Sequence, residues 1–327
     1  MEKKYSNKYV IKTGIGLQDV DNLRNSSYFL NETERYLKGE ISLDELDDIV
    51  ASYYESKPSV PERSEEADKI AIRIAKLISE DSFTFSVGQL LLIHRTLFSD
   101  VLEHAGELRQ YNFSKKEWVL DGKSVIYGDY RDLEAVLQYD FDQEKKRRYQ
   151  GLTIDETVER LAVFVANLWQ IHPFEEGNTR TVAVFFIKYL RSLGFDVTND
   201  TFAENAWYFR NALVRANYTN ISKGVYEDRS YLVRFLRNLL LNESNVLKNR
   251  DLHIDERIQA PENTRELRVI ELIRSNPQMT TAELSKELGV SERTVKTLMK
   301  TLADQKVIVR VGGKRFGQWK VLGKSAH

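Results

Sequence analysis

The sequence contains no cysteine, and this excludes disulfide bonds, thiolate metal sites and thiol nucleophiles together. It also lacks any run of about 18 apolar residues, so we expect no membrane-spanning helix and no membrane partner. The start, MEKKYSNKYVIKTG, has no apolar segment of the kind that signal peptides carry. These features together make the cytoplasm the expected compartment.

Hydrophobic residues make up 42% of the 327 residues and aromatic residues 11%, which suits a folded chain of two or three domains. Charge is spread unevenly along this chain. From Thr264 onward there are 13 Lys and Arg against 6 Asp and Glu, a net charge of +7 that leaves −8 on residues 1–263. A basic C-terminal part on an acidic body indicates different partners for the two parts.

Apolar residues at helical spacing predict a mainly α protein. Near the start, Gly39 ends one expected helix, and Ser42 with Glu45 forms a capping box for the next. Two of only five prolines mark SKPSVPERSEE as a linker. Asp121-Gly122 between WVL and VIY predicts a β-hairpin. The expected helices span 18–38, 43–56, 65–80, 86–103, 131–147, 154–171, 178–193, 202–221 and 228–241.

A polar stretch at 244–263 separates this helical body from a second unit. Its expected helices at 265–275, 280–288 and 291–304 are followed by basic strands in KVIVRVGGKRFGQWKVL. This order is typical of a winged helix-turn-helix. The predicted parts are an N-terminal helical segment at 1–60, a body at 64–243, the linker, and a winged helix at 264–327.

The winged helix carries candidate DNA-binding side chains at the start of its expected recognition helix, which Ser291 caps, and in its wing. They are Arg293, Thr294, Lys296, Lys314 and Arg315. The alternative is a protein-interaction module whose lysines are merely solvated. The net charge of +7 favours DNA.

The stretch QIHPFEEGNTRTVAVFFIKYL, residues 170–190, interrupts an apolar helix pattern with a histidine, two carboxylates and an arginine. Pro173 ends the first helix after His172, and Gly177 permits a backbone path closed to other residues. A second helix begins near Asn178 and is apolar nearly all round, so we expect it to be buried in the middle of the body.

The start of that second helix has the chemistry of a phosphate site. Unpaired N–H groups at 177–180 and the helix dipole attract an anion, and Arg180 adds a guanidinium. Glu176 offers an oxygen ligand for Mg²⁺ beside bound phosphates, and His172 offers a base that titrates near neutrality. The loop therefore carries the parts for phosphoryl or nucleotidyl transfer. The alternative is a set of solvated charges at a helix cap.

The residues HPFEEGNTR resemble the signature of the Fic family, His-Pro-Phe-x-Asp/Glu-Gly-Asn-Gly-Arg. HAGELRQYNF at 104–113 is similar to the segment before the family's flap, the hairpin at 112–128 to the flap itself, and YFRNALVRANY at 208–218 to the segment that closes on the adenine. The resemblance implies a Fic-type helical bundle with a β-hairpin flap. It also implies transfer of AMP from ATP, with Mg²⁺, to a Ser, Thr or Tyr hydroxyl of a target protein.

The same resemblance implies roles for individual residues. His172 would be the base, and Glu176 would bind Mg²⁺. The nucleotide would contact Gly177, Asn178, Thr179, Arg180, Tyr208 (or Phe209) and Asn217. The target segment would add as a strand to the flap at Val125, Ile126, Tyr127 and Gly128.

Two positions depart from the family pattern. Thr179 stands at the second glycine of the signature, and Ala183 stands where a second arginine grips the γ-phosphate and meets an inhibitory glutamate. The N-terminal segment resembles the antitoxin-like module that blocks some Fic proteins, but Glu32 falls one place late for the inhibitory pattern, so structural packing is favoured there. Removal of AMP, transfer from another nucleotide, and a nucleotide-sensing DNA-binding regulator stay open as alternatives, as does homo-oligomer formation.

Overall fold

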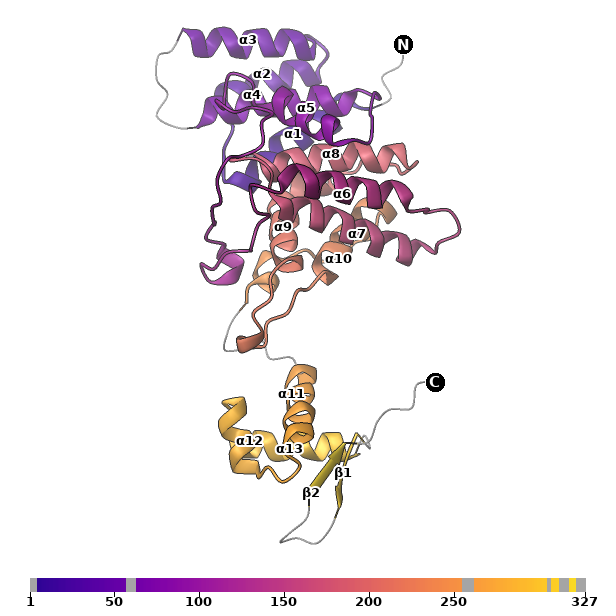
Figure 1. Ribbon diagram of the computed structural model, residues 1–327. Coiled ribbons are helices and arrows are strands. Elements are labelled where there is room, and N and C mark those ends of the chain that lie inside the picture. Colours follow the sequence, from indigo (N-terminus) through magenta and orange to yellow (C-terminus); the bar gives the residue numbers. More distant parts are fainter. Residues whose placement is uncertain (1–4, 57–62, 255–261, 305–306, 312–317, 322–327) are drawn as a thin grey trace. The chain divides into compact units, whose positions relative to one another are not determined.

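The computed structural model describes residues 5–56, 63–254, 262–304, 307–311 and 318–321. The chain divides into two compact units, a larger one of Met1–Thr219 with Glu227–His253 and a smaller one of Asn220–Tyr226 with Ile254–His327. Both units are mainly helical, and the strands described lie in the smaller one (Figure 1). The prediction of a mainly α protein is confirmed.

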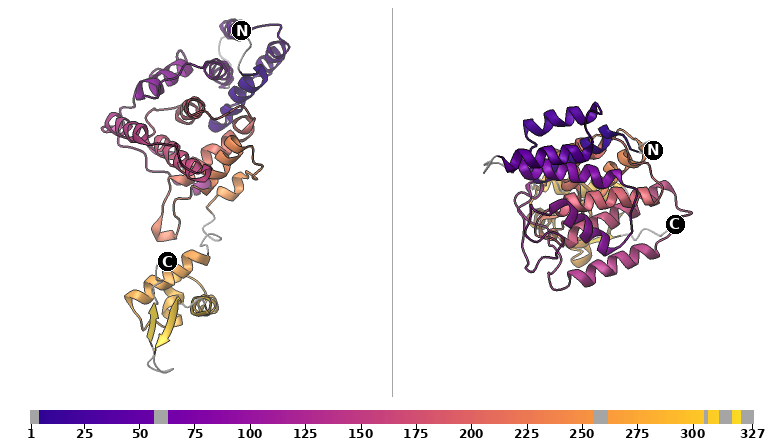
Figure 2. Two further views of the ribbon diagram at one scale, coloured as in Figure 1. Left: turned by 90° about the vertical axis from the view of Figure 1, so that its right-hand side faces the viewer. Right: turned by 90° about the horizontal axis from the view of Figure 1, so that it is seen from above.

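In the larger unit most successive helices are joined by short connections, whereas a long one between α5 and α6 carries the flap (Figures 1 and 2). The capping box predicted at Ser42 and Glu45 is present. The α-helices are α1 (Asn7–Gly16), α2 (Ser27–Leu37), α3 (Leu43–Glu55), α4 (Ser64–Ser79), α5 (Val87–Phe98), α6 (Leu133–Lys146), α7 (Ile154–Ile171), α8 (Asn178–Ser192), α9 (Thr201–Ala216) and α10 (Ser230–Leu241). Shorter 3-10 turns are η1 (Leu17–Asp21), η2 (Trp118–Leu120) and η4 (Asn249–Leu252).

Helix α8 is the centre of the larger unit. It contacts α4, α5 and α7, and in Figure 1 α4 and α5 lie above it and α7 below it. Every residue from Asn178 to Leu190 is buried, as the nearly all-round apolar pattern predicts. Around its second half, the ring of Phe85 lies 4.5 to 5.8 Å from the rings of Phe141, Phe164, Phe185 and Tyr189. This packing holds α8 in place and so positions its N-terminus, where the chemistry of the motif is expected.

The structure differs from the prediction in the first 40 residues. Where one helix is expected at 18–38, the chain forms the turn η1, a left-handed residue at Asn22 (φ 55°) and then α2. The helix α1 precedes them, where no helix was expected. Glycines give α1 a low helix propensity. A Cβ at Gly14 or Gly16, however, would lie 2.2 or 2.1 Å from main-chain oxygens of α4 and α9. Glycine lets α1 pack directly on both helices, so tertiary contact overrides local preference.

The predicted β-hairpin is a flap with little strand structure. The chain reverses at Asp121-Gly122, where both residues have positive φ. However, Trp118–Leu120 forms the turn η2, and in this described segment a single β-bridge joins Glu117 and Lys123. The expected strands WVL and VIY are therefore wrong. Val119 and Leu120 are adjacent and both 0% exposed, whereas a hairpin strand with one solvent-facing side buries only every second residue.

The smaller unit has the predicted winged helix-turn-helix order. Ser291 accepts a hydrogen bond from the Thr294 N–H and caps the third helix, and Gly289 ends the second with φ 63°. Apolar residues of the three helices and β1 form a separate core. The elements are η3 (Ile221–Lys223), α11 (Glu262–Ser275), α12 (Thr281–Leu288), α13 (Glu292–Asp304) and the antiparallel strands β1 (Ile308–Val311) and β2 (Gln318–Val321).

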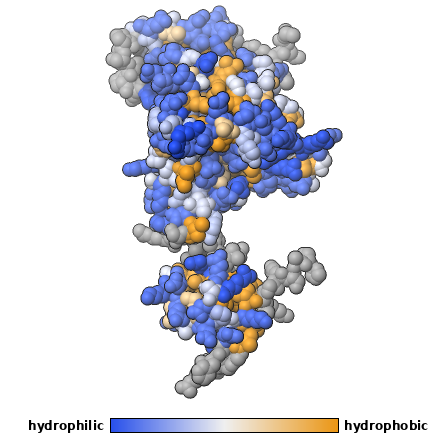
Figure 3. Space-filling view, in the orientation of Figure 1, coloured by the Kyte–Doolittle hydropathy of each residue, from blue (hydrophilic) through white to orange (hydrophobic). Residues whose placement is uncertain are grey.

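Hydrophilic side chains cover most of the face seen in Figure 3, and apolar side chains lie in separate patches. Among the described helices, none is both long and apolar enough to cross a membrane. The flap contributes exposed apolar side chains to the surface, Ile126 at 85% and Trp118 at 49% exposure.

Candidate active site

The loop between α7 and α8 is held in one shape by its own residues. His172 ends α7 in a left-handed conformation (φ 51°, ψ 60°). The Asn178 side chain closes the loop, since its Oδ1 accepts from the Phe174 N–H at 2.9 Å and its Nδ2 donates to the Phe174 carbonyl at 2.7 Å. Gly177 has φ 72°, and a Cβ there would lie 2.3 Å from the Phe98 ring, so glycine is required.

His94 of α5 braces the same loop, a role that no sequence pattern indicated. Its ring stacks on Phe174 at 3.7 Å. Its Nδ1 accepts from the Gly106 N–H at 2.7 Å, so Nε2 carries the proton and donates to the Glu176 carbonyl at 3.1 Å. Burial lowers the pKa of His94 to about 4, which keeps the ring neutral.

His172 lies under the flap with one ring nitrogen free. Its Nδ1 is 3.2 Å from the Trp169 carbonyl, so the proton sits on Nδ1 and Nε2 keeps its lone pair. Nε2 is buried and has no hydrogen-bond partner among the described residues. Burial, and then the charge of Lys115, lower the pKa of His172 well below its ordinary value. A neutral imidazole with a bare Nε2 is the form that a general base requires.

Arg109, for which no role was predicted, ties this loop to the flap. Its side chain donates to the carbonyls of His172 at 2.8 Å, Tyr111 at 2.6 Å and Gly128. Its own N–H donates to the Pro173 carbonyl at 2.9 Å. The buried guanidinium thus joins segments far apart in sequence, which explains why no local pattern revealed it.

Arg180, the predicted phosphate contact, is held by carboxylates. Its side chain is 0% exposed and pairs with Asp21 of η1 and with Glu66 of α4, each at 2.8 Å. Gln18 accepts a further hydrogen bond from it at 3.2 Å, and the Phe98 ring lies 4.8 Å from its guanidinium carbon. A phosphate would therefore have to compete with two carboxylates for this arginine.

The N-terminal segment reaches the motif through η1 rather than through Glu32. Glu32 pairs with Arg35 on its own helix at 2.7 Å. Residues Val10, Ile11 and Leu17, at the other end of the segment, are buried in the core. Structural packing is therefore a clear role of residues 5–23, but Asp21 adds a contact to the candidate site that the sequence did not indicate.

The first turn of α8 retains main-chain donors for an anion. Its first intrahelical hydrogen bond runs from the Thr181 N–H to the Gly177 carbonyl at 3.0 Å, so the preceding N–H groups at 178–180 have no intrahelical partner. Thr179, which replaces a glycine of the signature, accepts a hydrogen bond from the Trp169 Nε1 at 2.9 Å. That bond holds its side chain against α7. Ala183, one turn along, is fully buried.

Glu176 is accessible beside this helix end. Its side chain is 51% exposed and pairs with Arg63 at 3.0 Å, and Arg63 also pairs with Glu66 at 2.6 Å. Within the described residues, no three His, Asp or Glu side chains form a metal site of their own. Mg²⁺ commonly binds through one or two carboxylates together with substrate phosphates. A single accessible carboxylate beside an anion site fits that arrangement.

A buried ion pair holds the flap closed. Glu117, 1% exposed, pairs with Arg210 of α9 through both carboxylate oxygens at 2.6 and 3.0 Å. The same carboxylate accepts from the Tyr127 hydroxyl at 3.3 Å, and the Tyr127 ring stacks on His172 at 4.0 Å. The flap therefore covers His172 with an aromatic side chain that is itself anchored.

The four predicted target-binding residues have different surroundings. Val125 is buried and Ile126 is exposed. The Ile126 carbonyl accepts from the Gln170 side chain at 3.2 Å, and the Gly128 N–H donates to the Gln170 carbonyl at 3.4 Å. A strand added at this edge would have to use the remaining main-chain groups of the flap.

Tyr208 and Asn217, predicted near the nucleotide, make contacts within the fold. Tyr208 is 2% exposed, and its hydroxyl donates to the Tyr231 carbonyl at 3.4 Å. The Asn217 amide donates to the carbonyls of Ala166 at 3.0 Å and Leu213 at 2.9 Å, which joins α7 to the end of α9. Their role at the nucleotide stays a prediction.

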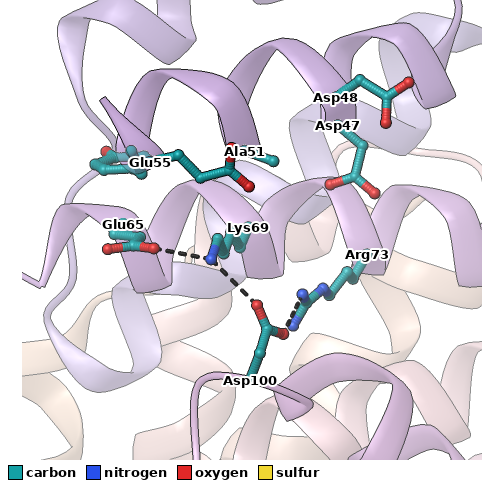
Figure 4. Close-up of a pocket in the computed structure, with 9 residues that line it drawn as sticks. Asp47, Asp48, Ala51, Glu55, Glu65, Lys69, Arg73 and Asp100 are labelled. Atoms are coloured by element: carbon teal, nitrogen blue, oxygen red, sulfur yellow. Dashed lines mark hydrogen bonds and ion pairs between the residues drawn. The ribbon is translucent and has the colours of Figure 1, made fainter. Parts of the chain in front are cut away.

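A charged cavity of about 320 Å³ lies elsewhere in the larger unit, between α3, α4 and the end of α5 (Figure 4). Its two cations are already paired, Lys69 with Glu65 at 2.8 Å and Arg73 with Asp100 at 2.5 Å. Further carboxylates, Asp47, Asp48 and Glu55, also line it. Because acids outnumber cations, this cavity does not offer a phosphate site.

The candidate DNA-binding residues that the structure describes lie on α13. Arg293 and Lys296 are exposed, and Lys296 pairs loosely with Glu292 at 3.7 Å. Thr294 is half-buried, with its hydroxyl 3.0 Å from the Ser291 Oγ. Lys314 and Arg315 lie outside the described residues.

Comparison with known proteins identifies relatives of both units. Residues 84–190 match the model of the Fic/DOC family, and residues 262–309 match that of a winged helix-turn-helix DNA-binding domain. The chain is 26% identical over 198 residues to the protein adenylyltransferase VbhT of Bartonella schoenbuchensis, covering 54% of this chain and 39% of that protein. A protein adenylyltransferase of Bartonella henselae is 24% identical over 191 residues, covering 53% and 33%. The chain therefore matches well under half the length of either relative.

Solved structures show weaker similarity. A Fic family protein from Desulfovibrio desulfuricans aligns with a TM-score of 0.44 and 13% identity, covering 98% of this chain and 89% of that one. BepC of Bartonella tribocorum, with bound AMPPNP, aligns with a TM-score of 0.42 and 20% identity, covering 53% and 83%. The two family models, together with the motif at 172–180, show that the chain carries a Fic/DOC family domain followed by a winged helix-turn-helix domain.

Proposed function

We propose that this protein is a Fic-type adenylyltransferase, which transfers AMP from ATP to a hydroxyl side chain of a target protein. The observation that carries the proposal is the neutral His172, whose bare Nε2 lies on the loop that leads into the anion-binding end of α8. Similarity to proteins named protein adenylyltransferase supports the reaction class, and AMPPNP in a solved relative supports ATP as the donor.

In the proposed reaction, the target hydroxyl oxygen attacks the α-phosphorus of ATP. The Nε2 of His172 accepts the hydroxyl proton, and the bond between the α-phosphorus and the oxygen that bridges to the β-phosphate breaks, so pyrophosphate leaves with the electron pair. The N–H groups at 178–180 and Arg180 stabilise negative charge on the phosphates. Glu176 would hold Mg²⁺, which neutralises charge on the phosphate chain when bound.

The chemistry is tested by incubating the full chain with cell lysate, Mg²⁺ and ATP labelled at the α-phosphate. We expect labelled protein with the wild type and none with His172→Ala. His104→Ala is the matched control, because His104 is an exposed histidine outside the motif, and it should label as the wild type does. Equal labelling by His172→Ala would contradict the proposed role of the base.

The same labelling assay distinguishes transfer from ATP from two alternatives, transfer from another nucleotide and removal of AMP from a modified target. Competition with unlabelled GTP, CTP and UTP measures nucleotide choice. Loss of label from a purified, already labelled target on addition of fresh enzyme measures removal of AMP. The proposal is supported if labelling from ATP persists in the presence of the other nucleotides and is faster than the loss of label.

A second candidate is a DNA-binding regulator that senses nucleotide without transferring AMP. The specific observation in its favour is Arg180, which two carboxylates hold away from solvent. Calorimetry with ATP and Mg²⁺ distinguishes the two candidates. Binding of ATP without any labelling, even at high protein concentration, would favour the regulator.

A further inference from the structure

Lys115 of the flap lies next to the candidate base. Its main-chain N–H donates to the Ser124 Oγ at 3.2 Å, which joins the two sides of the flap. Its Nζ is 5.7 Å from the centroid of the Phe113 ring, and that ring lies 5.8 Å from the His172 ring, edge to face. The ammonium group is therefore half-buried on the aromatic wall of the site.

Lys115 has no counter-charge of its own in the part of the chain that the structure describes. Of the other cations near the loop, Arg63 pairs with Glu176 and Arg210 with Glu117. Arg109 is held by main-chain carbonyls, among them that of His172. Burial lowers the pKa of Lys115, and the carboxylates of Asp21 and Glu176 are near enough to oppose that effect. These two acids belong to the candidate phosphate site, and among the described residues no ion pair ties the ammonium to either of them.

The net charge of the side chains at the N-terminal end of α8 affects how an anion binds there. Asp21, Glu66 and Glu176 bring three negative charges to the N-terminal end of α8, while Arg180 and Arg63 bring two positive ones. The paired cluster is thus net negative and would repel a phosphate chain. Without a further cation, the main-chain N–H groups and Mg²⁺ alone would have to overcome that repulsion.

We propose that Lys115 binds the β- and γ-phosphates of the nucleotide, the part that leaves as pyrophosphate. This inference rests on the proposed function. With the α-phosphate at His172, the β- and γ-phosphates extend towards Glu176 and the end of α8. On this side Lys115 is near carboxylates but forms no ion pair with them. Its ammonium keeps its proton throughout and neutralises the charge that pyrophosphate gains when the bond to the α-phosphorus breaks.

The test is calorimetry of the full chain with ATP, ADP and AMP in the presence of Mg²⁺. We expect Lys115→Gln to weaken ATP binding by about tenfold or more, because it removes a charge-assisted contact. AMP affinity should stay unchanged. Lys116→Gln is the matched control, since Lys116 is the adjacent, exposed lysine, and it should bind all three nucleotides as the wild type does. Lys115→Arg should recover most of the ATP affinity.

The results separate this inference from the proposed function. Wild-type ATP affinity in Lys115→Gln would overturn the inference and leave the proposed function intact. An equal loss of ATP and AMP affinity would also overturn it, because a distorted flap, rather than a lost phosphate contact, would then be the cause. Failure of the wild-type chain to bind ATP would overturn both.

Discussion

His94 and His172 lie at the same motif loop, and burial keeps both rings neutral for different purposes. His94 uses both nitrogens to hold the loop, one towards Gly106 and one towards the Glu176 carbonyl. His172 uses one nitrogen to fix its tautomer and leaves the other free. The positioning histidine and the candidate base are thus distinguished by hydrogen bonding, since the identity of the residue is the same.

The low pKa of His94 predicts a loss of stability in acid. An unfolded His94 takes up a proton as the pH falls below about 6.5, whereas the folded one does so only near pH 4. The unfolded state binds more protons between these values, so the free energy of unfolding should fall by about 2 kcal/mol from pH 7 to pH 5 on account of this residue. Urea unfolding of the wild type and of His94→Gln at both pH values measures it.

His94→Gln should be less stable than the wild type at pH 7, because the loop loses its brace, but its further loss at pH 5 should be smaller. His172 contributes a loss in the same direction in both proteins. If the two proteins lose equal stability between pH 7 and pH 5, a proton on His94 is not the cause.

At the scale of elements, η1 and α4 set the electrostatics of the α8 N-terminus. They contribute Asp21 and Glu66, which come from segments far from the motif in sequence and enclose Arg180 completely. Because η1 continues from α1, and α1 packs on α4 and α9, deleting residues 1–60 would remove part of the core as well as these contacts. A point substitution is the appropriate probe.

Asp21→Asn should tighten ATP binding. It removes one of the carboxylates that compete with phosphate for Arg180, and a charge-assisted contact of about 1.5–3 kcal/mol corresponds to roughly tenfold or more in affinity. The same change should lower the melting temperature, because a buried guanidinium loses a charged partner. Calorimetry and thermal unfolding measure the two effects.

Glu32→Gln is the control for Asp21→Asn, because Glu32 pairs with Arg35 on the surface of α2. It should change neither ATP affinity nor AMP transfer. Tighter ATP binding in Glu32→Gln, with no change in Asp21→Asn, would show that Glu32 is the inhibitory acid and that the contact at Arg180 is purely structural.

At the scale of the whole molecule, an acidic helical body is followed by a basic winged helix. The charge of −8 on residues 1–263 and +7 on the remainder favours the prediction that the winged helix binds DNA. Exposed Arg293 and Lys296 near the start of α13 are the described side chains best placed for that contact.

Arg293→Gln should weaken binding of the full chain to double-stranded DNA of random sequence at low salt. Loss of one phosphate contact should reduce the slope of log affinity against log salt concentration by about 0.9. Arg274→Gln removes the same charge from an exposed position on α11 and should leave the slope unchanged. Equal losses in both variants, or no DNA binding by the wild type, would contradict a specific role for α13.

Much of the architecture follows from local pattern. Apolar periodicity gave α3, α4, α7, α8 and α10, capping residues gave helix starts at Ser42 and Ser291, and the all-round apolar pattern of α8 gave its central position. The motif loop could also be recognised from the sequence, because proline, glycine and the charged residues lie within nine consecutive positions.

Tertiary structure decided the rest. Several features depend on contacts between segments separated by tens of residues. They are the helix α1, the 3-10 turn in the flap, the hydrogen bonds of His94 and Arg109, and the carboxylates that pair with Arg180. Local propensity does not encode such contacts, and it disfavours α1 outright. The sequence by itself determined which residue types lie at the proposed phosphate site. Packing determined which of their charges are free, because burial and pairing are set by neighbours that the local sequence does not contain.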